Sequence, residues 1–186
     1  MTQEVKKKTT EKMEGVVEHL RKELAGIRTG RASLALLDNI KVDYYGTPTA
    51  LRQVATLAVP ESRLITIQPW EANLVPVIEK AILASDLGLT PANDGKVIRL
   101  AIPSLTEERR KELVRLIKKL GEDARVGIRN HRRDANEDFK RFQKDGKLSE
   151  DDLKKTQDEV QKLTDQYIHK IDEILKHKEE EILERK

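Results

Sequence analysis

The chain has 186 residues, and charged and apolar residues each make up 37% of it. That balance leaves too few apolar side chains for one compact core throughout the chain. Part of the molecule is therefore expected to be thin, with a narrow hydrophobic core. The absence of cysteine excludes a disulfide framework and a thiolate metal site and fits a reducing compartment. A net charge of +3 permits a polyanionic partner without requiring one.

The start of the chain, residues 1–10, is polar and rich in lysine, and it lacks the apolar core of a signal peptide. No run approaches the roughly 18 apolar residues of a membrane span. We therefore expect a cytoplasmic protein that does not associate with membranes. Charged residues are sparse between Ala32 and Ser104 and dense on both sides. The chain therefore has a middle segment of low charge density between two highly charged flanks.

The first flank is predicted to be a helix, because apolar residues recur at spacings of three and four from Met13 to Ile27. The middle segment then changes to the period of short strands. Strands are predicted at residues 40–44, 54–59, 64–68 and 97–102, with turns at 46–48 and 94–95.

One helix is predicted within the middle segment, over residues 73–85, with Asn73 as its cap and Pro76 in its opening turn. The aromatic residues of this segment, Tyr44, Tyr45 and Trp70, are interpreted as strand core. The segment is therefore not predicted to stack RNA bases, which requires exposed aromatic rings beside basic residues.

The second flank carries two apolar stripes at helical spacing, from Leu113 to Phe142 and from Leu153 to Leu175, separated by a turn at residues 144–147. Ser104 before Glu107 and Ser149 before Asp152 have the spacing of helix caps. Three amphipathic helices that cannot be buried singly predict a three-helix bundle.

The fold class is accordingly α+β with two domains. Residues 1–30 and 105–186 are predicted to form the bundle, and residues 31–104 a small β/α/β domain inserted into it. The chain passes from the bundle into the small domain and later back again, and we call these two connections the crossings. They are predicted to act as a hinge, made of Thr29, Gly30, Arg31, Pro103, Ser104 and Leu105.

The predicted helix that carries the apolar stripe from Leu113 to Phe142 also contains four arginines within nine residues. They are Arg125, Arg129, Arg132 and Arg133. Helical spacing places them on one side, within an arc of about 100°. A solvated helix face usually alternates charges of both signs, whereas these like charges repel one another. Because guanidinium groups match phosphate oxygens, the row predicts a polyanionic partner held by its backbone phosphates.

Catalytic chemistry finds little support in this sequence. The glycines do not form a dinucleotide or Walker fingerprint, and no serine has the context of a nucleophile elbow. The four histidines lack partners at metal-ligand spacing. We therefore expect neither an enzyme nor a bound cofactor or metal.

Several motifs together resemble the bacterial ribosome recycling factors, in order and spacing across essentially the whole chain. They are Ile27-Arg28-Thr29-Gly30-Arg31-Ala32, Tyr44-Tyr45-Gly46, Ser85-Asp86-Leu87-Gly88-Leu89, Leu105-Thr106-Glu107-Glu108-Arg109-Arg110-Lys111, Ile128-Arg129-Asn130 and Arg132-Arg133-Asp134-Ala135. Leu34, Gly127 and His131 depart from the family pattern.

The resemblance implies an L-shaped monomer whose bundle lies on large-subunit ribosomal RNA after termination. It implies elongation factor G as a partner, whose GTP hydrolysis drives the small domain and the bundle against intersubunit bridges and splits the ribosome. Arg132 and Arg129 are implied as main RNA contacts, with Arg28, Arg31 and Arg110 in support, while Arg133 and Arg125 follow from the row itself. Two alternatives remain open, a helical-bundle adaptor and a general basic nucleic-acid chaperone.

Overall fold

The computed structural model describes residues 1–183 and divides the chain into two compact units. The first joins Met1–Ile27 to the residues from Glu107 onward, and the second is Arg28–Thr106. The borders lie at 27/28 and 106/107, close to the positions at which the charge pattern changes. The α+β class predicted from the sequence is confirmed. No helix within residues 1–183 is both long and apolar enough to cross a membrane.

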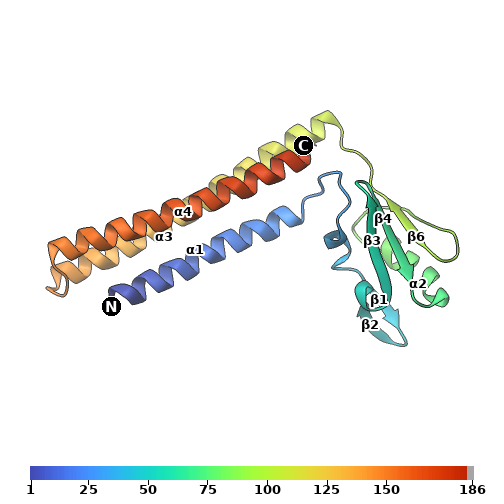
Figure 1. Ribbon diagram of the computed structural model, residues 1–186, viewed down its shortest axis with the longest axis horizontal. Helices are drawn as coiled ribbons and strands as arrows, with labels where there is room; N and C mark the ends of the chain where they lie inside the picture. Colours follow the sequence, from blue (N-terminus) through green and yellow to red (C-terminus); the bar gives the residue numbers. More distant parts are fainter. Residues whose placement is uncertain (184–186) are drawn as a thin grey trace. The chain divides into compact units, whose positions relative to one another are not determined.

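Three long helices form the first unit, α1 (Thr2–Ala25), α3 (Glu107–Lys144) and α4 (Glu150–Ile182). Each packs against both of the others, and the N-terminus of α1 lies at the end of the bundle where α3 turns into α4 (Figure 1). Gly146 makes that turn with a φ of 72°, a conformation that costs glycine little.

Helix α4 begins at the serine cap that the sequence predicts, whereas helix α3 does not. Ser149 caps α4, since its hydroxyl accepts the N–H of Asp152 at 3.1 Å, and acidic residues fill the first turn. Helix α3 begins at Glu107, so Ser104 lies too far upstream to occupy its cap position. The predicted cap at Ser104 is therefore wrong, although the acidic first turn is present.

Each bundle helix buries one apolar stripe, as its spacing predicts. At the end of the bundle near the α3–α4 turn, Phe139 is fully buried beside Ala135 and Val160. Farther along, Gly121 lets α3 approach Leu175 of α4 so closely that a methyl group at position 121 would overlap the leucine side chain.

The second unit contains a hairpin, a sheet and one helix. Its elements are β1 (Lys41–Tyr44), β2 (Thr47–Ala50), β3 (Ala55–Glu61), β4 (Leu64–Pro69), α2 (Val75–Leu83), β5 (Pro91–Asn93) and β6 (Ile98–Ala101), with single 3-10 turns at Leu34–Leu37, Leu51–Gln53 and Ala72–Leu74. Strands β1 and β2 form the hairpin, and the other four pair antiparallel in the order β3-β4-β6-β5.

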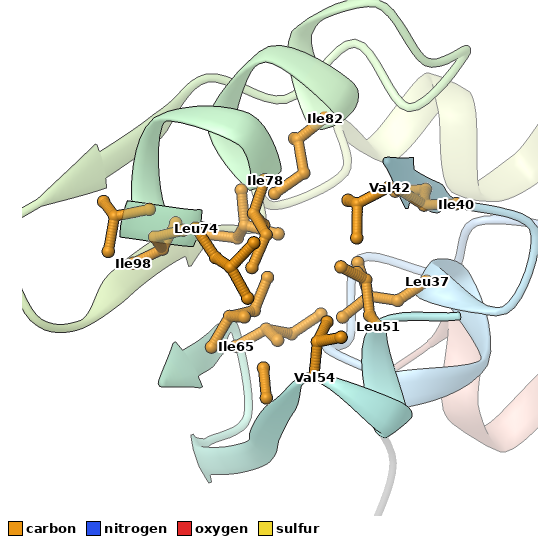
Figure 2. Packing of buried hydrophobic residues seen from close by; sticks show 14 of the residues in the cluster. Leu37, Ile40, Val42, Leu51, Val54, Ile65, Leu74, Ile78, Ile82 and Ile98 are labelled. Carbon is orange, nitrogen blue, oxygen red and sulfur yellow. The ribbon is translucent and has the colours of Figure 1, made fainter. Parts of the chain in front are cut away.

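One face of the four-stranded sheet is buried against α2. Ile65 of β4 lies opposite Leu100 of β6 in the register, and both side chains are fully buried. Figure 2 shows Ile78 and Ile82 of α2 pointing into the same cluster, which also receives Val42 from β1. The small unit thus has a hydrophobic core of its own.

Three details of the small unit differ from the sequence prediction. Strands β2 and β5 were not predicted, and Thr47 and Pro48, expected in a turn, belong to β2. Helix α2 starts at Val75, after a 3-10 turn, so Asn73 does not cap it, whereas Pro76 lies in its first turn as predicted.

Two of the three aromatic residues predicted as strand core are exposed instead. Tyr45 is 78% exposed and Trp70 is 64% exposed, while Tyr44 is half-buried. Trp70 follows the end of β4 and donates its indole N–H to the Thr56 hydroxyl at 2.9 Å. Aromatic content alone predicts burial, but the position of a residue at a turn or beyond a strand end decides its exposure.

Candidate nucleic-acid interface on helix α3

The four arginines Arg125, Arg129, Arg132 and Arg133, here called the arginine row, extend over about 12 Å of α3. Ile128, one turn before Arg132, is fully buried in the bundle, so one edge of the row borders the buried stripe of this helix. The arginine row does not face solvent freely along its whole length, because it runs beside α4.

Arg125 is the member of the row that is most engaged by α4. Its Nε donates to Asp172 Oδ1 at 3.0 Å, its Nη2 donates to the same oxygen, and its Nη1 donates to Glu122 Oε2 at 3.2 Å. Hydrogen bonding to Asp172 raises the pKa of the Arg125 guanidinium above its usual value. Only 23% of the side chain is exposed, so Arg125 fastens α3 to α4.

The other three arginines keep most of their five N–H donors free. Arg129 donates to Glu122 at 3.4 Å, and Arg132 donates to Gln161 Oε1 of α4 at 3.3 Å. Within residues 1–183, Arg133 is exposed and makes no hydrogen bond or ion pair. These three guanidinium groups can therefore take up phosphate oxygens without first breaking strong internal bonds.

Sequence reasoning missed the residues of α4 that hold the arginine row in place. Gln161 is itself oriented by a bond from its Nε2 to Asp165 Oδ1 at 2.9 Å, which leaves its Oε1 for Arg132. Gln161, Asp165 and Asp172 recur at helical spacing on one side of α4. The signal in the sequence for these contacts is the pairing of two patterns. The polar side of α4 matches the arginine row when the two helices are placed antiparallel.

Arg28 and Arg31 lie in the small unit, and both line a cleft of about 170 Å³ there. Arg28 Nη2 donates to the carbonyl oxygen of Asp86 at 2.6 Å. Five of the six predicted hinge residues line the same cleft, namely Gly30, Arg31, Pro103, Ser104 and Leu105, and the sixth, Thr29, is buried. Arg110 belongs to the first turn of α3 and is half-buried.

Gly30 shows why a glycine stands at this crossing. Its φ is 77°, and a Cβ added to it would lie 3.2 Å from Cγ of Leu105. Both the backbone conformation and the neighbouring leucine therefore disfavour a side chain. The two crossings of the chain are packed against each other within the small unit through this contact.

Within residues 1–183, no three histidine, aspartate or glutamate side chains come together in a group that could hold a metal ion. His131 lies half-buried on the inner side of α3, and its Nδ1 is buried without a hydrogen-bond partner in the described part of the chain.

A three-helix bundle with an inserted small domain and a cationic row defines a class of protein suited to a polyanionic surface. The family model described as ribosome recycling factor matches residues 20–183. The chain is 57% identical over 184 residues to the ribosome-recycling factor of Desulfatibacillum aliphaticivorans, covering 99% of this chain and 100% of that protein. The factor of Geobacillus kaustophilus is 55% identical with the same coverage. The chain belongs to the ribosome recycling factor family.

Solved structures agree with this assignment. A solution structure of a ribosome recycling factor has a TM-score of 0.81 and 45% identity, covering 98% of this chain and 97% of that one. The T. thermophilus ribosome recycling factor, in models with E. coli elongation factor G bound to the E. coli post-termination complex, has a TM-score of 0.68 and 46% identity, covering 98% and 99%. The resemblance inferred from the motifs is confirmed.

Proposed function

We propose that this chain recycles ribosomes by dissociating the post-termination complex together with elongation factor G and GTP. The observation that carries the proposal is family membership through both units, because relatives bearing the name ribosome-recycling factor match 99% of the chain. A relative 46% identical to this chain occurs in models with elongation factor G on the post-termination complex.

The bundle would bind large-subunit ribosomal RNA through the arginine row. Arg132, Arg133 and Arg129 supply the contacts, since their donors are available, and Arg125 chiefly holds α3 against α4. Arg28, Arg31 and Arg110 would support this binding. Charge-assisted bonds to phosphates position a protein on RNA without reading its sequence.

The small unit would move relative to the bundle when elongation factor G acts on it, and this movement would disrupt intersubunit bridges. The chain itself would catalyse no reaction and bind no cofactor, because GTP is bound and hydrolysed by the partner. We expect it to act as a monomer in the cytoplasm.

The adaptor alternative requires an apolar seam left over after the helices have packed. Among the described residues of α3, only Leu116 and Val126 are exposed large apolar side chains, and they do not share one side of the helix. This disfavours the adaptor. A general nucleic-acid chaperone would bind duplexes broadly and would not require elongation factor G.

The test is the rate at which purified post-termination ribosomes split in the presence of this chain, elongation factor G and GTP. Arg132→Ala should weaken ribosome binding about tenfold or more, because it removes charge-assisted hydrogen bonds. Arg141→Ala is the matched control, an exposed arginine on another side of α3 that pairs with Asp138. We expect it to behave like the unaltered chain.

The outcomes separate the claims. No splitting by the unaltered chain contradicts recycling itself. Full binding by Arg132→Ala contradicts only the assigned RNA contact. Affinity should also fall steeply with salt if phosphates are the partner, and a flat response would favour the adaptor.

A further inference from the structure

The tip of the β1–β2 hairpin presents a tyrosine in an unusual conformation. Tyr45 has a φ of 51° and is 78% exposed, and Gly46 after it also has a positive φ, of 86°. Two-residue turns of this kind favour asparagine followed by glycine, and a bulky residue at positive φ is strained. The fold alone does not explain an exposed aromatic ring here, so the ring itself needs a role.

Glu71 holds this ring and its neighbour in fixed positions. The Tyr44 hydroxyl donates to Glu71 Oε1 at 2.9 Å, and the Tyr45 hydroxyl donates to Oε2 at 3.2 Å. The two ring centroids lie 4.7 Å apart with the planes at 73°, an edge-to-face pair. A partner would therefore meet aromatic side chains that are already ordered, which lowers the entropy lost on binding.

The charge around these rings is negative. Within residues 1–183, the hydrogen bonds to the Glu71 carboxylate come from the two tyrosines, and it has no ion pair. Asp43, in β1 shortly before the turn, is also exposed and has no ion pair in the described part of the chain. A carboxylate beside an open ring, as Glu71 is here, repels phosphate and attracts a cation.

An arginine side chain fits this arrangement better than RNA does. A guanidinium group can stack on the face of a tyrosine while its N–H groups donate to a carboxylate. We propose that Tyr44, Tyr45 and Glu71 form a docking site for an arginine presented by a protein partner. This site goes beyond the proposed function, and it involves none of the residues assigned to RNA.

The direct test uses the full chain, labelled with ¹⁵N and titrated with acetyl-Gly-Arg-Gly-amide while amide resonances are followed by NMR. The matched probe replaces arginine with citrulline, which has a similar shape and no charge. We expect the arginine peptide alone to shift the amides of Tyr45, Gly46 and Glu71. Glu71→Gln and Tyr45→Ala should each weaken this binding about threefold or more.

Two further variants keep the result interpretable. Tyr45→Asn removes the ring but suits the turn, so it should weaken binding without disturbing the hairpin. Leu83→Ala changes a residue of α2 that is 61% exposed, and it should bind the peptide normally. Equal shifts with the citrulline peptide, shifts of the same amides with hexauridylate, or no shift with the arginine peptide would each overturn the proposal.

The partner class is tested in the assembled complex by replacing Tyr45 with p-benzoylphenylalanine and irradiating purified post-termination ribosomes with elongation factor G. A cross-link to a protein segment beside an arginine supports the site, and Glu71→Gln should lower its yield. Cross-links to RNA, or none while the chain co-sediments with ribosomes, overturn it. Since the peptide titration contains no ribosomes, its failure is distinct from failure of the recycling function.

Discussion

Arg125 differs from its neighbours in the arginine row because Asp172 and Glu122 engage its donors. Helical counting could place all four arginines on one side of α3, since this needs only the period of the helix. It could not distinguish Arg125 from Arg132, because the distinction comes from side chains of α4. At the scale of residues, the sequence thus predicts which side of the helix the arginines share better than it predicts the contacts that each of them makes.

We predict that Arg125→Ala lowers the free energy of unfolding by about 1 kcal/mol, since it removes a partly exposed interhelical ion pair with several hydrogen bonds. Asp172→Asn should have a similar effect. Urea unfolding of both single variants and the double variant measures the coupling between them. Strictly additive effects would show that the pair does not fasten the helices.

Asp94 provides a prediction about pH. Its carboxylate accepts the backbone N–H groups of Val97 at 2.9 Å and Lys96 at 3.0 Å and pairs with Arg99. The bonds from Val97, Lys96 and Arg99 lower the pKa of Asp94 from 3.8 to about 2. Because the folded pKa is depressed, this contribution to stability is present above about pH 4 and is lost as the pH falls through 2.

NMR titration of the Asp94 carboxyl carbon tests this directly, and the midpoint should lie well below that of an unstructured aspartate. Asp94→Asn should flatten the corresponding part of the pH dependence of unfolding. An ordinary midpoint for Asp94 would mean that the turn at Asp94-Gly95 does not depend on the carboxylate.

At the scale of elements, periodicity could predict the long helices because their apolar stripes repeat over many turns. It could not predict β2 and β5, which are four and three residues long and contain Pro48 and Pro91. A proline within a short segment leads to the prediction of a turn, yet proline is tolerated in edge strands. Strands β2 and β5 form because they pair with β1 and β6, and this pairing cannot be read from the local sequence.

Two glycines of α3 should respond oppositely to alanine. At Gly127 an added Cβ would make ordinary contact with Val16 at 3.5 Å, so Gly127→Ala should raise stability by about 1 kcal/mol through helix propensity. At Gly121 the Cβ would overlap Leu175, whose Cδ2 lies 2.9 Å away. Displacing this leucine should outweigh the propensity gain, and we expect Gly121→Ala to lower stability by about 1 kcal/mol or more.

Thermal and urea unfolding of the two variants, compared with the unaltered chain, decide this prediction. Each variant serves as the control for the other, because both place the same residue within the same helix. A gain in both would show that Leu175 moves aside freely, and a loss in both would show that the groove between α1 and α3 cannot accept a methyl group.

At the scale of the whole molecule, the charge distribution could predict that a small domain interrupts a bundle, because the two parts differ in composition. It could not place the borders to the residue. The predicted hinge residues belong to the small unit, whose borders lie at 27/28 and 106/107. The packing of Gly30 against Leu105 accounts for this, since it ties both crossings into that unit.

Only two segments of chain join the units, so we predict that they reorient independently in solution. Residual dipolar couplings should then require a separate alignment tensor for each unit. Because the chain has no cysteine, one cysteine can be placed in each unit and joined by a cleavable cross-linker. The locked protein should bind ribosomes but fail to split them until the linker is cleaved. Normal splitting in the locked state would mean that recycling does not require the hinge, whatever mobility the free protein has.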